Sequence, residues 1–220
     1  MKVLIITGGR IEEAFGLQYL RQQKFDLLIA ADSGIEFLYR NQIKPDILVG
    51  DFDSADREIV EYYRGDSQVE FREFQPEKDD TDTEIAMLLA MEKGATEIHL
   101  LGATGSRLDH MIANVFLLGL PTEKGIAAYL VDEQNRVRLI RERTVLSREE
   151  QYGDYISLIP FMGEVTGLTL EGFKYPLCGY TMGGFHSIGI SNEIQQPEAV
   201  ITMKSGWLIL VEAKDENLGF

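Results

Sequence analysis

The chain has few cysteines and tryptophans and no long apolar run. It holds one cysteine and one tryptophan in 220 residues. A lone cysteine, Cys178, excludes an internal disulfide and suits a reducing compartment. No apolar run is long enough to span a bilayer, and the apolar start at residues 1–7 is too short for a signal peptide. We therefore expect a cytoplasmic protein that does not cross a membrane.

Positive charge is also scarce, since 36 acidic residues face 21 basic ones and the formal net charge is −15. Binding to a nucleic-acid backbone needs a positive surface, so we expect no nucleic-acid partner. A nucleotide is not excluded, because a divalent cation can lie between carboxylates and phosphates. The composition is otherwise ordinary for a globular protein, with 45% hydrophobic and 26% charged residues.

The first part of the chain alternates short apolar runs with helical patterns. Strands are predicted at residues 3–7, 27–31, 47–50, 69–71, 97–101 and 127–131. Helices are predicted between them, at residues 11–22, 35–41, 57–63, 81–93 and 107–118. Such alternation is typical of βαβ units, so we expect a mainly parallel sheet flanked by helices.

After about residue 135 the pattern changes to short β-rich segments divided by turn signals. They are predicted at residues 136–140, 155–160, 164–170, 184–190, 199–204 and 207–212. No strong helical period lies between them, which indicates an antiparallel β-sandwich or barrel. The predicted fold class is therefore α/β plus all-β, with an α/β domain over residues 1–134 and a β-sandwich over residues 135–220.

Carboxylates and small residues follow the predicted strands of the first domain. In a parallel sheet, ligands collect at the carboxyl ends of the strands, so these positions are where a site is expected. The four segments in question are Gly8-Gly9-Arg10, Asp32-Ser33-Gly34, Asp51-Phe52-Asp53-Ser54 and Gly102-Ala103-Thr104-Gly105-Ser106-Arg107. A rim of this composition suits Mg²⁺ and phosphates.

Asp51 and Asp53 carry the sharpest single signal. Alternate residues of an extended strand point the same way, so this spacing can put both carboxylates on one side. Two unit charges about 4 Å apart repel by roughly 4 kcal/mol at an effective dielectric near 20, which favours a counter-ion. Mg²⁺ would supply it and leave positions for water and phosphate oxygens. The alternative is a solvated loop in which Asp53 and Ser54 cap the next helix.

A second acidic segment precedes the predicted helix at 81–93. Thr81 and Glu84 match a capping box at its start. Capping explains Asp79 and Asp82 less well, since one cap needs one acceptor, so both stay candidates for a site. Lys78 could meet a phosphate, or it could pair with Asp79 at the surface.

The glycine-rich segment that starts at Gly102 opens the predicted helix at 107–118. Its backbone N–H groups can bind an anion, although the Gly-Lys-Ser/Thr ending of a Walker A loop is absent. Arg107 would offer a planar fork to phosphate. Asp109 could orient Arg107, accept a substrate proton, or only lie in the first turn of the helix. Asn114 lies one turn beyond His110, and a hydrogen-bonded structural role is expected for both.

Together these segments resemble the thiamine pyrophosphokinase family. The resemblance runs in family order from about residue 30 to residue 193. It is carried by Ala-Asp-Ser-Gly from residue 31, Pro45-Asp46, Gly-Asp-Phe-Asp-Ser from residue 50, Lys-Asp-Asp-Thr-Asp from residue 78, the segment from Gly102 to Asn114, and Ser191-Asn192-Glu193. Ser33 stands where the family often has glycine.

The resemblance implies an enzyme that transfers the pyrophosphoryl group of ATP to thiamine, giving AMP and thiamine diphosphate, with Mg²⁺ as cofactor. It implies a nucleotide-binding catalytic domain followed by a thiamine-binding β-sandwich. It also implies a homodimer whose active sites lie between subunits.

Motif matching extends the resemblance to single residues. Mg²⁺ would be held by Asp51, Asp53 and Asp82. ATP would be contacted by Asp32, Lys78, Asp79, Thr81, Gly102 and Arg107. The thiamine pyrimidine would be held by Ser191 and Asn192. The base that takes the hydroxyl proton stays open between Asp109 and Asp32, and no aromatic partner for the thiamine rings is identifiable.

Three alternatives remain beside this interpretation. A haloacid-dehalogenase-like phosphatase could use Asp51 as nucleophile, but the usual Gly-Thr ending after the second aspartate is absent. A pyrophosphokinase could act on another hydroxymethyl acceptor, such as a pterin. A non-catalytic nucleotide or thiamine sensor could keep the pocket, although binding alone does not require so many aspartates.

Overall fold

The computed structural model describes residues 1–52, 55–73 and 80–215. Three predicted site residues, Asp53, Lys78 and Asp79, lie outside this part of the chain. The chain divides into two compact units, Met1–Glu133 and Gln134–Phe220. No helix in the described ranges combines the length and the apolar character needed to cross a membrane.

Over its described residues, the first unit is built on a sheet with the strand order β4-β3-β2-β1-β5-β6, in which neighbouring strands pair in parallel. The strands are β1 (Lys2–Ile6), β2 (Leu27–Ala31), β3 (Ile47–Gly50), β4 (Glu70–Glu73), β5 (Glu97–Leu101) and β6 (Ala127–Val131). Of the strands inside the sheet, β1, β3 and β5 are buried along almost their whole length, as expected of a parallel sheet covered on both faces.

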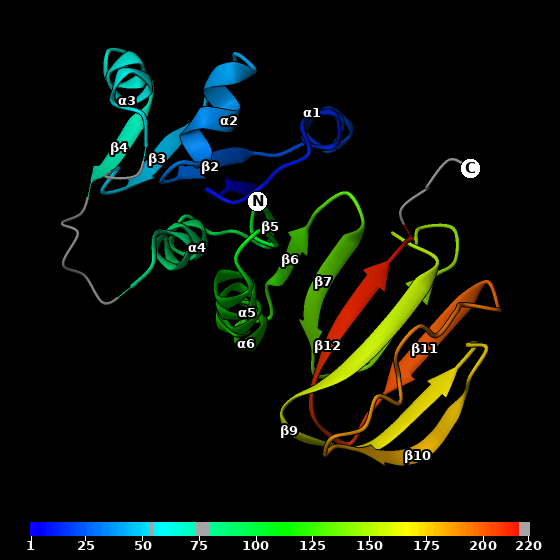
Figure 1. Cartoon of the computed structure of the whole chain (residues 1–220). Helices are drawn as coiled ribbons and strands as arrows, with labels where there is room; N and C mark the ends of the chain where they lie inside the picture. Colours follow the sequence, from blue (N-terminus) through cyan, green and yellow to red (C-terminus); the bar gives the residue numbers. More distant parts are fainter. Residues whose placement is uncertain (53–54, 74–79, 216–220) are drawn as a thin grey trace. The chain divides into compact units, whose positions relative to one another are not determined.

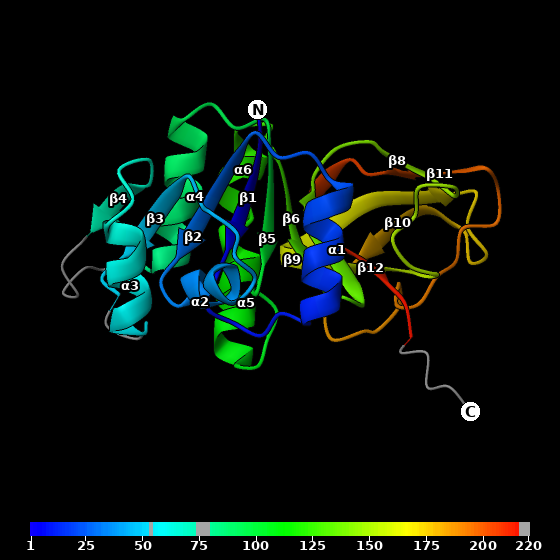
Figure 2. The same ribbon diagram turned by 90° about the horizontal axis from the view of Figure 1, so that it is seen from above.

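In the described part of this unit, helices α1, α2 and α3 lie on one face of the sheet and α4, α5 and α6 on the other (Figures 1 and 2). Their bounds are α1 (Glu13–Gln22), α2 (Gly34–Arg40), α3 (Arg57–Arg64), α4 (Asp82–Glu92), α5 (Leu108–Leu117) and α6 (Gly119–Glu123). Side-chain caps fix several starts: Thr81 accepts a hydrogen bond from the backbone of Glu84 at 3.2 Å, as its capping-box pattern predicts.

The second unit consists of antiparallel strands. Their bounds are β7 (Asn135–Ile140), β8 (Thr144–Ser147), β9 (Tyr155–Glu171), β10 (Leu177–Met182), β11 (Glu198–Thr202) and β12 (Ser205–Ala213). The strand β9 bends at Met162 and Gly163, which have φ of 57° and 144°. Its first half pairs with β12, which also pairs with β7, while its second half pairs with β10 and β11. The two layers enclose a core of aliphatic side chains that includes Leu158, Leu170 and Leu210.

The predicted fold class is confirmed, and some elements of the second unit differ from the prediction. The predicted strands at 155–160 and 164–170 are two halves of β9, because the Met162-Gly163 turn signal marks a bend and not a chain reversal. The predicted strand at 184–190 is not formed. Gly184 and Gly189 there have φ of 71° and 102°, which interrupts an extended path. The strands β8 and β10 carry no strong pattern and were not predicted.

Candidate active site

A cavity of about 360 Å³ opens in the first unit at the carboxyl ends of the parallel strands. It is lined by the segments that follow β1, β2 and β5 and by the starts of α4 and α5. From β1 the chain winds to β2, β3 and β4 on one side, and α4 then leads it back to β5 on the other side. Ligands of open α/β sheets bind at such a reversal of strand order.

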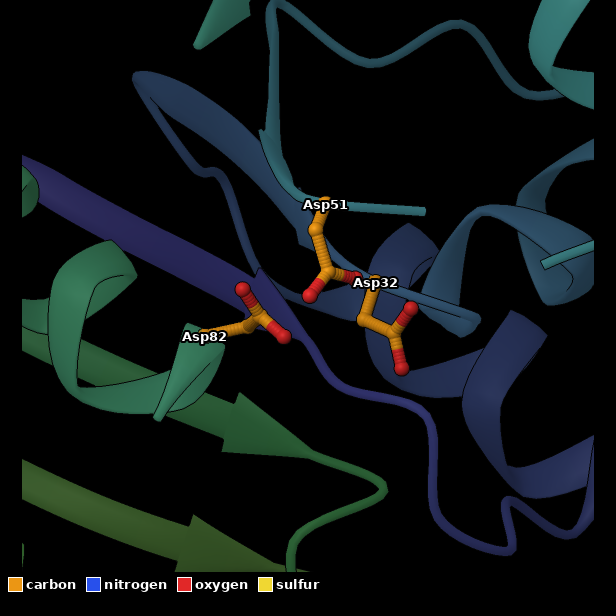
Figure 3. A group of neighbouring side chains, drawn as sticks. All are labelled: Asp32, Asp51 and Asp82. Carbon is orange, nitrogen blue, oxygen red and sulfur yellow. The ribbon is translucent and has the colours of Figure 1, made fainter. Parts of the chain in front are cut away.

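Three aspartates from separate elements gather at this rim (Figure 3). Asp32 follows β2, Asp51 follows β3, and Asp82 is the first residue of α4. One carboxylate oxygen from each lies within 4.8 Å of the others, and all three residues are half-buried. The structure thus brings together Asp51 and Asp82, both predicted as metal ligands, and adds Asp32, for which the family resemblance implies a contact with ATP.

The backbone around the three aspartates allows this close approach. The amide of Asp32 donates to the carbonyl of Val49 at 2.9 Å, so the ends of β2 and β3 stay side by side. Gly50 has φ of 150°, and a Cβ there would lie 3.3 Å from the Asp32 backbone and 3.5 Å from Asp82 Oδ1. A side chain at position 50 would therefore crowd two of the three aspartates.

The backbone between Asp51 and the next predicted ligand, Asp53, is not extended at Phe52. Alternating side-chain directions require an extended backbone through the intervening residue, but Phe52 has φ of 56° and is buried. A left-handed residue ends the extended path, so the period of two no longer fixes which way the next side chain points. The predicted role of Asp53 as a metal ligand stays a prediction.

Three carboxylates at this separation repel one another. At about 4 Å and an effective dielectric near 20, each pair costs roughly 4 kcal/mol before solvent screening. The positive end of α4 offsets part of this cost for Asp82, since acidic residues are stabilised in a first helical turn. A hard divalent cation would offset more, and carboxylate oxygens are the ligands that Mg²⁺ prefers. The donor set is therefore suited to Mg²⁺.

Glycine-rich backbone from two loops forms another wall of the cavity. The amide of Arg10 donates to the carbonyl of Gly105 at 2.9 Å. A Cβ on Gly9 would lie 2.1 Å from the carbonyl oxygen of Gly102 and 2.3 Å from that of Gly105. The loops after β1 and β5 thus pack backbone against backbone, which only glycine at position 9 permits. Such a wall leaves room for a phosphate to approach main-chain N–H groups.

The start of α5 contributes Arg107 and Asp109. The guanidinium of Arg107 donates to both oxygens of Asp109, with Nε to Oδ1 at 3.1 Å and Nη2 to Oδ2 at 2.5 Å. Because of these hydrogen bonds the pKa of Asp109 falls to about 2, and the pKa of Arg107 rises. Asn114, which is buried, donates to the carbonyl of Ala103 at 2.9 Å and so ties α5 to the glycine-rich loop. The structural hydrogen bond predicted for Asn114 is present.

Two family models match the chain over most of its length. The model described as thiamin pyrophosphokinase, catalytic domain, matches residues 19–130, and the one described as thiamin pyrophosphokinase, vitamin B1 binding domain, matches residues 143–208. The chain belongs to the thiamine pyrophosphokinase family. The predicted family and the predicted enzyme class, a transferase, are thereby confirmed.

Individual relatives agree with this assignment. The thiamine pyrophosphokinase of Bacillus subtilis (strain 168) is 34% identical over 194 residues, which cover 86% of this chain and 88% of the relative. A crystal structure of thiamine pyrophosphokinase from Bacillus subtilis superposes with a TM-score of 0.87 at 29% identity, covering 98% of this chain and 100% of the other. The structure of the Geobacillus thermodenitrificans thiamin pyrophosphokinase gives a TM-score of 0.85 at 30% identity, covering 99% of both chains.

The residues that the family resemblance assigns to thiamine lie in the second unit. Asn192 is 4% exposed. Its Oδ1 accepts from the backbone amides of Tyr175 at 3.0 Å and Glu193 at 2.9 Å, and its Nδ2 donates to the Tyr175 carbonyl at 2.9 Å. Ser191 has φ of 55°, and its amide donates to Ser157 Oγ at 3.0 Å. The side-chain amide of Asn192 therefore holds the neighbouring backbone in place. Contact of thiamine with Ser191 or Asn192 stays a prediction.

Proposed function

We propose that the chain catalyses the Mg²⁺-dependent transfer of the pyrophosphoryl group of ATP to the hydroxyl of thiamine, giving thiamine diphosphate and AMP. The observation that carries the proposal is the convergence of Asp32, Asp51 and Asp82 beside a glycine-walled cavity. Carboxylates that can hold a cation, next to backbone that can hold phosphates, suit a reaction that depends on positioning and on charge neutralisation.

Mg²⁺ would be held by Asp32, Asp51 and Asp82, with Asp53 kept as a further candidate from its motif. The bound cation would neutralise charge on the phosphate oxygens. The phosphates would lie against the loop from Gly102 and meet Arg107, whose side chain lines the cavity. Thr81, also in the lining, is proposed to contact ATP, and Lys78 and Asp79 keep the ATP contacts that their motif implies.

The chemical step that we propose is in-line attack of the thiamine hydroxyl oxygen on the β-phosphorus of ATP. A bond forms between the hydroxyl oxygen and the β-phosphorus. The bond from the β-phosphorus to the oxygen that bridges it to the α-phosphorus breaks, and AMP leaves with this bridging oxygen. The hydroxyl proton passes to a base. Asp109 is a poor candidate for that base, because a carboxylate with a pKa of about 2 holds a proton weakly at neutral pH. We propose instead that Asp109 orients Arg107 toward the phosphates.

Replacing Asp109 by asparagine tests this role. Asparagine keeps one acceptor for Arg107 but loses the charge, so the KM for ATP is expected to rise about tenfold while kcat changes little. Because the pKa of Asp109 is depressed, the carboxylate is charged at every pH above about 2, and its removal leaves the pH profile of kcat unchanged near neutrality. Steady-state kinetics between pH 6 and pH 9 measure both effects. Loss of the acid limb of the profile, with a hundredfold fall in kcat, would show that Asp109 is the base.

Several finer features of the proposal rest on the family resemblance. The second unit, with Ser191 and Asn192, is proposed to bind thiamine. This division of labour is supported by the vitamin B1 binding description of the model that matches residues 143–208. The family resemblance is also the ground for proposing a homodimer with active sites between subunits. A cytoplasmic location is proposed on a different ground, the presence of a single cysteine.

The proposed activity is tested by measuring AMP formation from ATP with thiamine and Mg²⁺. Thiamine-dependent AMP is expected, and chelation of Mg²⁺ should lower the rate at least about a hundredfold, since the charge stabilisation by a metal is worth several kcal/mol. A pterin alcohol in place of thiamine serves as the acceptor control. AMP formed with the pterin alone would reassign the acceptor, release of phosphate without AMP would favour a phosphatase, and binding of both ligands without AMP would favour a sensor.

A further inference from the structure

Arg10 lines the same cavity as Arg107 and the Gly102 loop. It is the last residue of the Gly8-Gly9-Arg10 segment after β1, and its exposed side chain belongs to the cavity lining. Its backbone is fixed, because its amide donates to the Gly105 carbonyl and Gly9 packs against the carbonyl of Gly102. The backbone that carries the Arg10 side chain is therefore held in place on the side of the cavity that the glycine loops form.

Of Arg10 and Arg107, which both line the cavity, Arg10 has the guanidinium that is more available to bind an anion. Arg107 shares its charge with Asp109 through two hydrogen bonds. Over residues 1–52, 55–73 and 80–215, by contrast, no carboxylate forms an ion pair with Arg10. Three aspartates lie at the same rim, so even with one divalent cation bound they leave a formal excess of one negative charge. A polyphosphate adds more negative charge, which a cationic side chain in addition to Arg107 would help to offset.

We propose that Arg10 is a phosphate-binding residue of this cavity, gripping the phosphate chain of the nucleotide opposite the aspartate cluster. The inference rests on the proposed function, which supplies the nucleotide. Strand order supports the arrangement: Asp51 and Asp32 follow β3 and β2, while Arg10 and Arg107 follow β1 and β5 further along the same edge. The planar guanidinium can bind two phosphate oxygens at once, which a lysine ammonium cannot reproduce.

Binding of two probes, each carrying half of the nucleotide, tests the proposal without catalysis. Inorganic triphosphate with Mg²⁺ presents the phosphate chain alone, and adenosine presents the nucleoside alone. Calorimetric titration of Arg10→Gln is expected to show a Kd for magnesium triphosphate raised about tenfold to a hundredfold, the range for a charged hydrogen bond, with the Kd for adenosine unchanged. Arg10→Lys should recover part of the loss. In the full reaction, the KM for ATP should rise while the KM for thiamine stays constant.

The matched control is Arg21→Gln, an exposed arginine in the last turn of α1 that does not line the cavity. It removes the same charge from the same unit and should leave the Kd for magnesium triphosphate within about twofold. Equal weakening by Arg10→Gln and Arg21→Gln would reduce the effect to net charge, and an unchanged Kd in Arg10→Gln would overturn the proposal. If the unaltered protein forms no AMP, the proposed function fails, but the triphosphate titration still decides the role of Arg10.

Discussion

Replacing Asp51 by asparagine is expected to lower kcat/KM for ATP at least about a thousandfold and to change how Mg²⁺ affects thermal stability. Asparagine has the shape of aspartate but supplies a neutral oxygen, and a lost metal ligand at a phosphoryl-transfer site costs several kcal/mol of transition-state stabilisation. In the unaltered protein one carboxylate oxygen of Asp51 lies within 4.8 Å of those of Asp32 and Asp82. Their mutual repulsion is relieved by a cation, or by removing one charge.

The two conditions of a thermal melt separate these effects. With a chelator present, Asp51→Asn should unfold at the same temperature as the unaltered protein or slightly above it, because one of three repelling charges is gone. The gain is at most about 1 kcal/mol once solvent screening is counted. With Mg²⁺ present, the unaltered protein should gain stability by binding the ion, and the variant should gain much less. The unaltered protein should therefore be the more stable of the two only in the buffer that contains Mg²⁺.

Asp56→Asn is the matched control for this experiment. Asp56 caps α3 by accepting a hydrogen bond from the Glu58 amide at 2.8 Å, and asparagine caps a helix about as well as aspartate. This variant removes the same charge close by in the sequence, and it should keep both the activity and the response to Mg²⁺. Near-normal turnover of Asp51→Asn at saturating Mg²⁺ would mean that Asp51 does not hold the metal.

The sequence could predict which edge of the sheet carries the site, because that follows from a general rule. Apolar strands alternating with helices indicate a parallel sheet, and polar residues after each strand must then meet at one edge. The pattern of strands alone could not predict which aspartates converge, because that depends on strand order; the expectation that Asp51 and Asp82 share a metal came from the family resemblance. Asp32 and Asp51 are 19 positions apart in the chain, yet they follow β2 and β3, which the structure shows to be adjacent. Asp51 and Asp53 are closer in the sequence, but Phe52 between them has a left-handed conformation. No local sequence pattern predicts that conformation.

The second unit shows where periodicity fails for a different reason. Residues 184–190 contain enough apolar side chains to suggest a strand, but Phe185 and Ile188 are exposed and the glycines at 184 and 189 have positive φ. The residues of β10, by comparison, include Gly179 with φ of 61°, and β10 still pairs with β9 through shifts in register. The strand β10 tolerates such irregularity because the second half of β9 pairs with it from Leu177 to Met182. Local sequence does not contain that information.

Replacing Gly9 by alanine is expected to lower both stability and activity strongly, because the loops after β1 and β5 pack closely at this residue. The added methyl carbon would lie 2.1 Å from the Gly102 carbonyl oxygen and 2.3 Å from that of Gly105, and both are backbone atoms that cannot turn aside. The loops after β1 and β5 must move apart, which should cost about 2 to 3 kcal/mol of stability. It should also lower kcat/KM for ATP at least about a hundredfold, because displaced loops no longer hold the phosphates in line with the aspartates.

Gly119→Ala separates this effect from a general cost of alanine. Gly119 begins α6 and is not among the glycines with positive φ, and apart from its chain neighbours and the backbone of its own helix no atom lies within 4 Å of the site of an added Cβ. Alanine there should leave activity unchanged and stability equal or slightly higher, since alanine is the better helix former. Kinetics well below the melting temperature of Gly9→Ala remove any contribution from unfolded protein. A Gly9→Ala enzyme with normal KM for ATP would mean that the two loops do not need their backbone contact to bind the phosphates, and the glycine wall would then be a feature of the fold alone.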